Sequence, residues 1–169
     1  MPANASPFKT SAPDPGPEQR LHMCGVLVGG EPGLSACSLE IARGGVSYTV
    51  DTLSAIHASH PDAELTFIVG ADTARTLPAW REPARLLRLA NVAVAERDGA
   101  GRREVIDSLS ALDTPGRVSF LALPIVDVSS SEVRRRASRG EPIDELVGAG
   151  VASYIEEEGF YREPDGAAG

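Results

Sequence analysis

Short β-branched and aromatic runs alternate along this chain with stretches whose apolar residues recur at helical spacing. The runs at 65–69, 91–95 and 118–121 are too short for buried helices and predict strands. The stretches at 82–90 and 102–112 predict helices between them. Each return to the same sheet edge needs a crossover, so the alternation predicts an α/β fold, with a parallel sheet and helices on both faces. We expect residues 65–69 to form a central strand.

The N-terminal third carries weaker signals. Apolar spacing from Pro17 predicts a helix over 17–28, although residues 25–29 also fit a short strand. Residues 36–41 predict a strand at the sheet edge. Glycines 44 and 45 then precede a helix that we expect to begin near Thr49, with first-turn amide groups free to bind an anion.

Length and composition point to one domain. A chain of 169 residues with 42% apolar content can bury one sizeable core, and we expect a single domain over residues 1–162. From Ser131 onward the pattern predicts two or three short helices, followed by a disordered tail over residues 163–169.

The charge and the cysteines exclude several classes of protein. A net charge of −8 argues against bulk binding to nucleic acid or to an anionic membrane. Cys24 and Cys37 lie in no CxxC or Cys/His cluster, so we expect no metal site. The first residues lack the apolar core of a signal peptide, and no segment is long enough to span a membrane, so we expect a cytoplasmic protein.

The first candidate site follows the strand at 65–69. Ligands of open α/β sheets bind beyond the carboxyl ends of the strands, where Gly70 would allow close backbone approach and the Asp72 carboxylate would accept hydrogen bonds from ribose hydroxyls. Trp80, the only tryptophan, would stack on a flat heteroaromatic ring. The alternatives are that Asp72 caps a short helix and that Trp80 is a core residue.

The second candidate site is the run VDVSSSEVRRRASRG. Ser129 and Ser130 precede a helix, where hydroxyls either cap the free amide groups or hold a phosphate, and Arg134 one turn later supplies a forked donor set. Arg97, at the end of the strand at 91–95, either binds phosphate or is solvated.

Together these motifs resemble the bacterial nicotinate-nucleotide adenylyltransferases. The resemblance rests on ExxRxGxSYTxDTL from Glu40, then FIVGADxxxxLPAW, LLRLANVAVAERDG, VSSSEVR and a terminal LVxxxVxxYIxxxGFY. It implies a Rossmann-like nucleotidyltransferase fold and the transfer of AMP from Mg-ATP to nicotinate mononucleotide, giving deamido-NAD and pyrophosphate without a covalent intermediate. ATP and nicotinate mononucleotide are then the partners, Mg²⁺ enters with ATP, and a homo-oligomer is possible.

The resemblance also implies roles for individual residues. The backbone amides of Tyr48 and Thr49 would hold the nicotinate carboxylate while Trp80 stacks on the pyridine ring, so we expect the acid to be preferred over the amide. The remaining roles are ribose contacts for Gly70 and Asp72, ATP phosphate contacts for Ser129, Ser130 and Arg134, and contacts to the nicotinate nucleotide phosphate for Lys9 and Arg97.

The sequence departs from the family in two places. Phe8 stands where the family loop PxxxPPHK has a histidine, and the glycine-rich turn GGxFDPxHxGH, whose histidines stabilise the transferred charge, is absent. The catalytic residues are therefore unknown, and we expect an in-frame extension upstream of Met1 to encode a strand, that turn and a helix. The alternatives are a nucleotide-binding relic without catalysis and an adenylyltransferase for another phosphorylated acceptor such as phosphopantetheine.

Overall fold

The computed structural model describes residues 1–7, 15–96, 101–110, 112, 117–124, 126 and 128–162. The chain divides into two compact units. Tyr48–Val126 forms one, which we call the sheet unit, and Met1–Ser47 with Asp127–Gly169 forms the other, which we call the helical unit.

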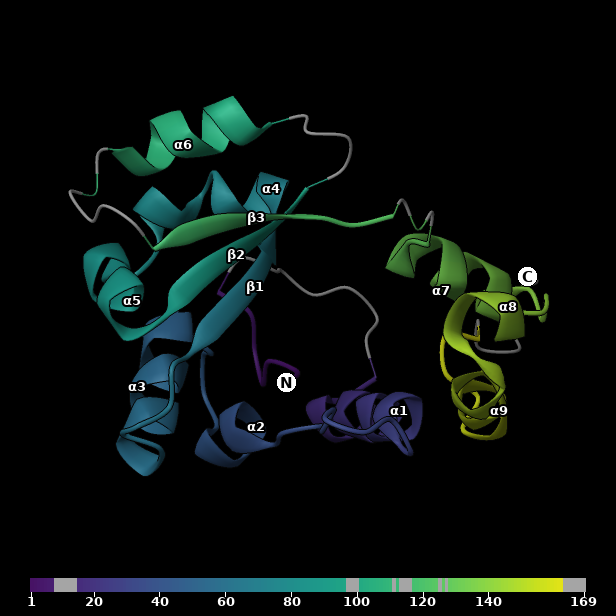
Figure 1. Ribbon diagram of the computed structural model, residues 1–169. Helices are drawn as coiled ribbons and strands as arrows, with labels where there is room; N and C mark the ends of the chain where they lie inside the picture. Colours follow the sequence, from purple (N-terminus) through teal and green to yellow (C-terminus); the bar gives the residue numbers. More distant parts are fainter. Residues whose placement is uncertain are drawn as a thin grey trace. The chain divides into compact units, whose positions relative to one another are not determined.

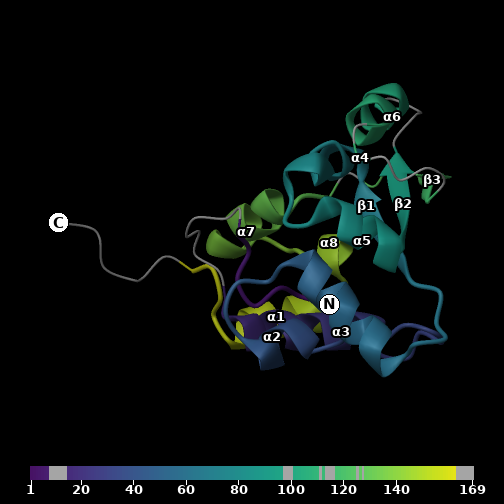
Figure 2. The same cartoon turned by 90° about the vertical axis from the view of Figure 1, so that its left-hand side faces the viewer.

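Within the described ranges, the sheet unit contains three parallel strands in the order β1-β2-β3 (Figures 1 and 2). They are β1 (Thr66–Gly70), β2 (Asn91–Glu96) and β3 (Val118–Ala122), each within one residue of the prediction. The α/β class with a parallel sheet is therefore confirmed. The expected central position of the first strand is wrong, because β2 is the middle strand and β1 lies at an edge.

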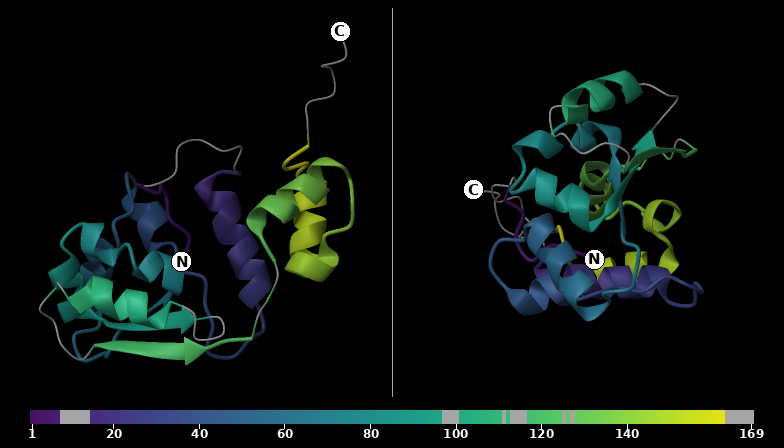
Figure 3. Two further views of the ribbon diagram at one scale, coloured as in Figure 1. Left: turned by 90° about the horizontal axis from the view of Figure 1, so that it is seen from above. Right: turned by 60° about the vertical axis from the view of Figure 1, so that its left-hand side comes forward.

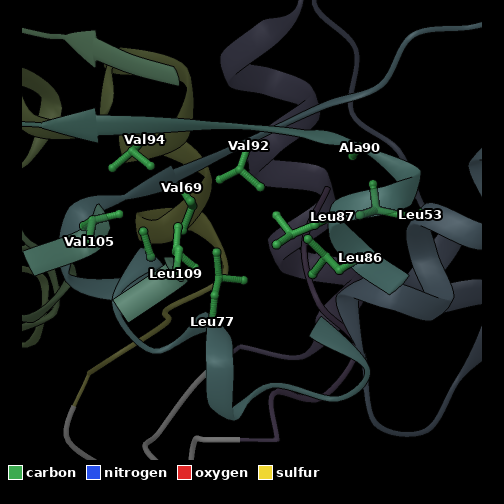
Figure 4. Close-up of a cluster of buried hydrophobic side chains, with 11 residues drawn as sticks. Leu53, Val69, Leu77, Leu86, Leu87, Ala90, Val92, Val94, Val105 and Leu109 are labelled. Carbon is green, nitrogen blue, oxygen red and sulfur yellow. The ribbon is translucent and has the colours of Figure 1, made fainter. Parts of the chain in front are cut away.

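Helices surround the core on one face of this sheet. They are α3 (Thr49–Ser59), α4 (Ala71–Ala74), the short 3-10 helix η1 (Leu77–Ala79), α5 (Pro83–Leu89) and α6 (Arg102–Ser110). Their apolar residues join Val69, Val92 and Val94 in one cluster (Figure 4).

The two crossovers of this unit share one face of the sheet. Both run in the same direction across the sheet, and such crossovers have the same hand, so they place their helices on the same side. On the opposite face Ile68 is 63% exposed.

The helical unit packs short helices around a smaller core. It contains α1 (Pro17–Val28), α2 (Leu39–Arg43), α7 (Ser130–Ser138), α8 (Asp144–Val147) and α9 (Ala149–Glu157). Figure 3 shows the green α7 and the yellow α9 side by side, and their residues Val133, Val151 and Ile155 share one buried cluster with Ile143. The helix over 17–28 and the three short C-terminal helices are confirmed, so residues 25–29 do not form the alternative strand.

The predicted edge strand at 36–41 is wrong, because α2 begins at Leu39. Gly44 ends this helix with φ 70°, and its N–H donates to the carbonyls of Glu40 and Ile41. A glycine in a left-handed conformation is the usual end of a helix, so the local signal at Gly44 favours helix over strand.

Two predictions concern the extent of the domain and the C-terminal tail. The predicted tail, residues 163–169, lies outside the described residues. The single domain over 1–162 stays a prediction. Among the described residues no helix is long and apolar enough to cross a membrane.

Candidate functional site

The start of α3 presents backbone amide groups, as predicted. Tyr48 is the N-cap in an extended conformation (φ −99°, ψ 130°), and no side chain caps the helix. The carbonyl of Tyr48 accepts hydrogen bonds from the amides of Asp51 and Thr52. In the part of the chain that the structure describes, the amides of Tyr48 and Thr49 make no hydrogen bond, so they can bind an anion.

Trp80 is half buried at the end of η1. Its ring packs beside Phe67 with a centroid distance of 6.1 Å, and its Nε1 donates to Thr76 Oγ1 at 2.9 Å. The indole therefore contacts the core on one side while part of its surface stays open. A half-buried ring in this position can stack on a ligand and also pack against the core.

Arg81 links the loop after Trp80 to the start of α3. Its Cζ lies 4.8 Å from the centroid of the Tyr48 ring, and its Nη1 lies 3.2 Å from Asp51 Oδ2. Glu82 follows with φ 49°, a left-handed conformation that is unusual for a residue other than glycine. Sequence reasoning missed Arg81 and Asp51, although Asp51 lies inside the SYTxDTL motif and Arg81 directly follows Trp80.

Gly70 and Asp72 lie where β1 ends. Gly70 is the N-cap of α4, so the alternative that Asp72 caps this helix is wrong. A Cβ built on Gly70 would meet no atom within 4 Å, which leaves room for a ligand beside the backbone. The Asp72 side chain is 93% exposed and pairs with Arg75, which also pairs with Glu104.

The end of β2 holds a buried carboxylate. Glu96 is 6% exposed, its Oε1 lies 3.0 Å from Arg102 Nη2, and Oε2 has no hydrogen-bond partner within the described ranges. Arg102 in turn lies over the ring of Phe120, 4.5 Å from its centroid. This pair fixes the start of α6 against the ends of β2 and β3. Arg97, the next residue, and Lys9 lie outside the described residues.

Of the two predicted serines, Ser129 caps α7. Ser129 is the N-cap, and its hydroxyl accepts a hydrogen bond from the Glu132 amide at 3.1 Å. Ser130 is exposed in the first turn. The capping alternative is therefore confirmed for Ser129, and a phosphate role for either serine stays a prediction.

Ion pairs distinguish the arginines of α7. Arg135 and Arg136 bind Glu132 at 2.7 and 2.8 Å, and their hydrogen bonds, Arg135 first, lower the pKa of that carboxyl to about 2. The pKa values of both arginines are raised by the same contacts. Arg139 lies 3.8 Å from Glu141. By contrast, Arg134 makes no ion pair within the described residues, so its guanidinium can receive a phosphate.

The predicted residues fall into two groups. Tyr48, Thr49, Gly70, Asp72 and Trp80 belong to the sheet unit, whereas Ser129, Ser130 and Arg134 belong to the helical unit. Across the described positions there is no group of three or more His, Cys, Asp or Glu residues that could hold a metal ion.

Comparison with known proteins identifies the family. No protein-family model matches the chain. A protein of Pelobacter propionicus named "Probable nicotinate-nucleotide adenylyltransferase" is 36% identical over 96% of this chain and 83% of its own length. One of the same name from Gemmatimonas aurantiaca is 36% identical over 99% of this chain and 80% of its own.

A solved structure agrees with the fold. The nicotinic acid mononucleotide adenylyltransferase of Plasmodium falciparum complexed with NaAD superposes with a TM-score of 0.67, over 94% of this chain and 78% of that one. At 16% identity this likeness shows a Rossmann-like nucleotidyltransferase fold. The extent and identity of the bacterial matches show more: the chain belongs to the nicotinate-nucleotide adenylyltransferase family.

Proposed function

We propose that this chain transfers AMP from ATP to nicotinate mononucleotide, giving deamido-NAD and pyrophosphate in NAD biosynthesis. One observation of the site supports the proposal in addition to family membership. The uncapped first turn of α3 and the half-buried indole of Trp80 belong to the same unit, and Arg81 connects their two segments. An anion site beside an aromatic surface suits a pyridine ring that bears a carboxylate.

The reaction makes modest chemical demands on the protein. A phosphate oxygen of nicotinate mononucleotide bonds to the α-phosphorus of ATP while the bond from that phosphorus to the β-phosphate oxygen breaks, and pyrophosphate leaves. A phosphate monoester has a second pKa of about 6, so the attacking group is already deprotonated near neutral pH. The protein must therefore chiefly position the substrates and stabilise charge.

Each predicted residue has a role in this scheme. We assign the nicotinate ring to Trp80 and to the amides of Tyr48 and Thr49. The other assignments are ribose for Gly70 and Asp72, ATP phosphates for Ser129, Ser130 and Arg134, and the acceptor phosphate for Lys9 and Arg97. The open space at Gly70 supports these assignments, as does the guanidinium of Arg134, which makes no ion pair with any residue that the structure describes.

Magnesium would enter as part of Mg-ATP. Mg²⁺ keeps several waters and binds substrate phosphates with one or two carboxylates, so it needs no dedicated cluster of protein ligands. The exposed Asp72 is one such carboxylate, although it is paired with Arg75. A cytoplasmic location and a homo-oligomer stay predictions.

The test is to incubate the protein with Mg-ATP and each of three acceptors: nicotinate mononucleotide, nicotinamide mononucleotide and phosphopantetheine. We expect deamido-NAD and pyrophosphate from the first alone, detected by chromatography. Product from phosphopantetheine instead would support the alternative acceptor. Tight binding of deamido-NAD without turnover would support a nucleotide-binding relic.

A further inference from the structure

Arg81 is a charged side chain beside the proposed nicotinate site, and the scheme above leaves it without a role. It directly follows Trp80, and its guanidinium reaches the first turn of α3. We propose that this guanidinium binds the carboxylate of the nicotinate ring and thereby selects the acid over the amide. The inference rests on the proposed function.

The position of the guanidinium supports this role. It lies 4.8 Å above the Tyr48 ring and 3.2 Å from Asp51, so it stands at the same end of α3 as the amides of Tyr48 and Thr49. The Arg81 side chain is 50% exposed, which leaves it accessible to a ligand. A pyridine ring stacked on the neighbouring indole would bring its substituent to this end of the helix.

The donor pattern of the guanidinium suits a carboxylate. Nη1 is directed at Asp51, and Nε lies 3.9 Å from Glu82, whereas Nη2 has no hydrogen-bond or ion-pair partner in the described part of the chain. A guanidinium offers only donors, and a carboxylate offers only acceptors. A carboxamide would present its own NH₂ donors to Arg81, so the site would bind the amide more weakly.

The residue after Arg81 has an unusual backbone conformation. Glu82 adopts its left-handed conformation as the N-cap of α5, and its carboxylate lies 3.2 Å from Arg85 Nη1. Left-handed non-glycine residues are disfavoured and concentrate at functional sites. A purely structural role for Arg81, joining the loop to α3, would instead affect both nucleotides equally.

Asp51 weakens the proposed contact between Arg81 and the nicotinate carboxylate. Its carboxylate competes with the ligand for the guanidinium and repels the nicotinate carboxylate. Removing its charge in Asp51→Asn should therefore strengthen binding of the acid severalfold and leave binding of the amide unchanged.

Calorimetric titration of the full chain with nicotinate mononucleotide and with nicotinamide mononucleotide tests the proposal. We expect Arg81→Met to weaken binding of the acid by about 10- to 100-fold, the range for a charged hydrogen bond, and to leave the amide nearly unchanged. Arg81→Lys should recover part of the loss. Arg85→Met is the matched control, because it also removes an arginine paired with Glu82, and both affinities should persist.

Several results would overturn the inference. Equal weakening of both nucleotides in Arg81→Met, or an unchanged preference for the acid, would give Arg81 a structural role while deamido-NAD synthesis by the wild type kept the proposed function intact. Failure of the wild type to bind nicotinate mononucleotide would overturn both. If circular dichroism shows that Arg81→Met is unfolded, Asp51→Asn decides, and an unchanged affinity for the acid in that variant would contradict the inference.

Discussion

The sheet unit and the helical unit are held together in different ways. In the sheet unit, eleven buried apolar residues form one cluster across three strands and the helices on one face (Figure 4). In the helical unit four buried residues form the core, as far as the structure describes it, and ion pairs join arginines and glutamates on and around α7. Apolar burial therefore positions the proposed acceptor residues, whereas charge pairing determines which arginine of α7 stays available.

The largest effect should come from the core of the sheet unit. Leu86 is completely buried, so Leu86→Ala removes its packing and leaves a cavity that should cost about 2–5 kcal/mol of unfolding free energy. Urea unfolding measures the change. Leu27→Ala is the control, because Leu27 is 62% exposed on α1 and its replacement should change stability by less than about 0.5 kcal/mol. Equal losses of unfolding free energy in the two variants would contradict the contrast between the two units.

A second prediction tests whether ion pairs on α7 leave Arg134, and not Arg135, available to bind phosphate. Arg134→Gln should weaken ATP binding by about 1.5–3 kcal/mol, the range for a hydrogen bond to a charged group. Arg135→Gln is the matched control on the same helix, since Arg135 is engaged with Glu132 and Glu141. Calorimetry with ATP should separate the two variants. Similar losses in both would mean that the ion pairs do not determine which arginine binds phosphate.

Local patterns account for most of the predicted fold. Predicted and observed bounds agree within about two residues for strands β1, β2 and β3 and for helices α3, α5 and α6. The agreement is close because hydrophobic periodicity and turn residues act over short distances along the chain. The predicted edge strand at 36–41 is wrong for a local reason as well, because the helix-ending signal of Gly44 outweighs the apolar run before it.

Features that depend on distant neighbours were not predictable in this way. The edge position of β1 follows from lateral strand order, which no run of sequence encodes. The role of Arg81 depends on a contact with Asp51, thirty positions earlier in the chain. Likewise VRRRASR offers several equivalent arginines, and only the folded positions of Glu132, Glu141 and Glu145 distinguish Arg134 from its neighbours.

A third prediction concerns Trp80, which combines core contact with an open surface. Trp80→Ala should weaken binding of nicotinate mononucleotide by about 1–3 kcal/mol, the range for base stacking on an aromatic residue, and leave ATP binding nearly unchanged. Trp80→Phe should retain part of the affinity. Calorimetry is the measurement, and circular dichroism checks the fold. Unfolding of Trp80→Ala would show that the indole is chiefly a core residue beside Phe67.

The smallest effect should be the acid sensitivity of the helical unit. Arg135 and Arg136 lower the pKa of Glu132 from 4.5 to about 2, so its ion pairs stabilise the fold above pH 4.5 and are lost as the pH falls through that window. Thermal unfolding across this window should show a smaller loss of stability in Glu132→Gln than in the wild type. Glu157→Gln, at the exposed end of α9, is the control and should follow the wild type. Because the side chains of Glu132, Arg135 and Arg136 are 28–41% exposed to solvent, the difference should shrink at high salt. A difference that salt does not change would mean that Glu132 acts by some means other than charge.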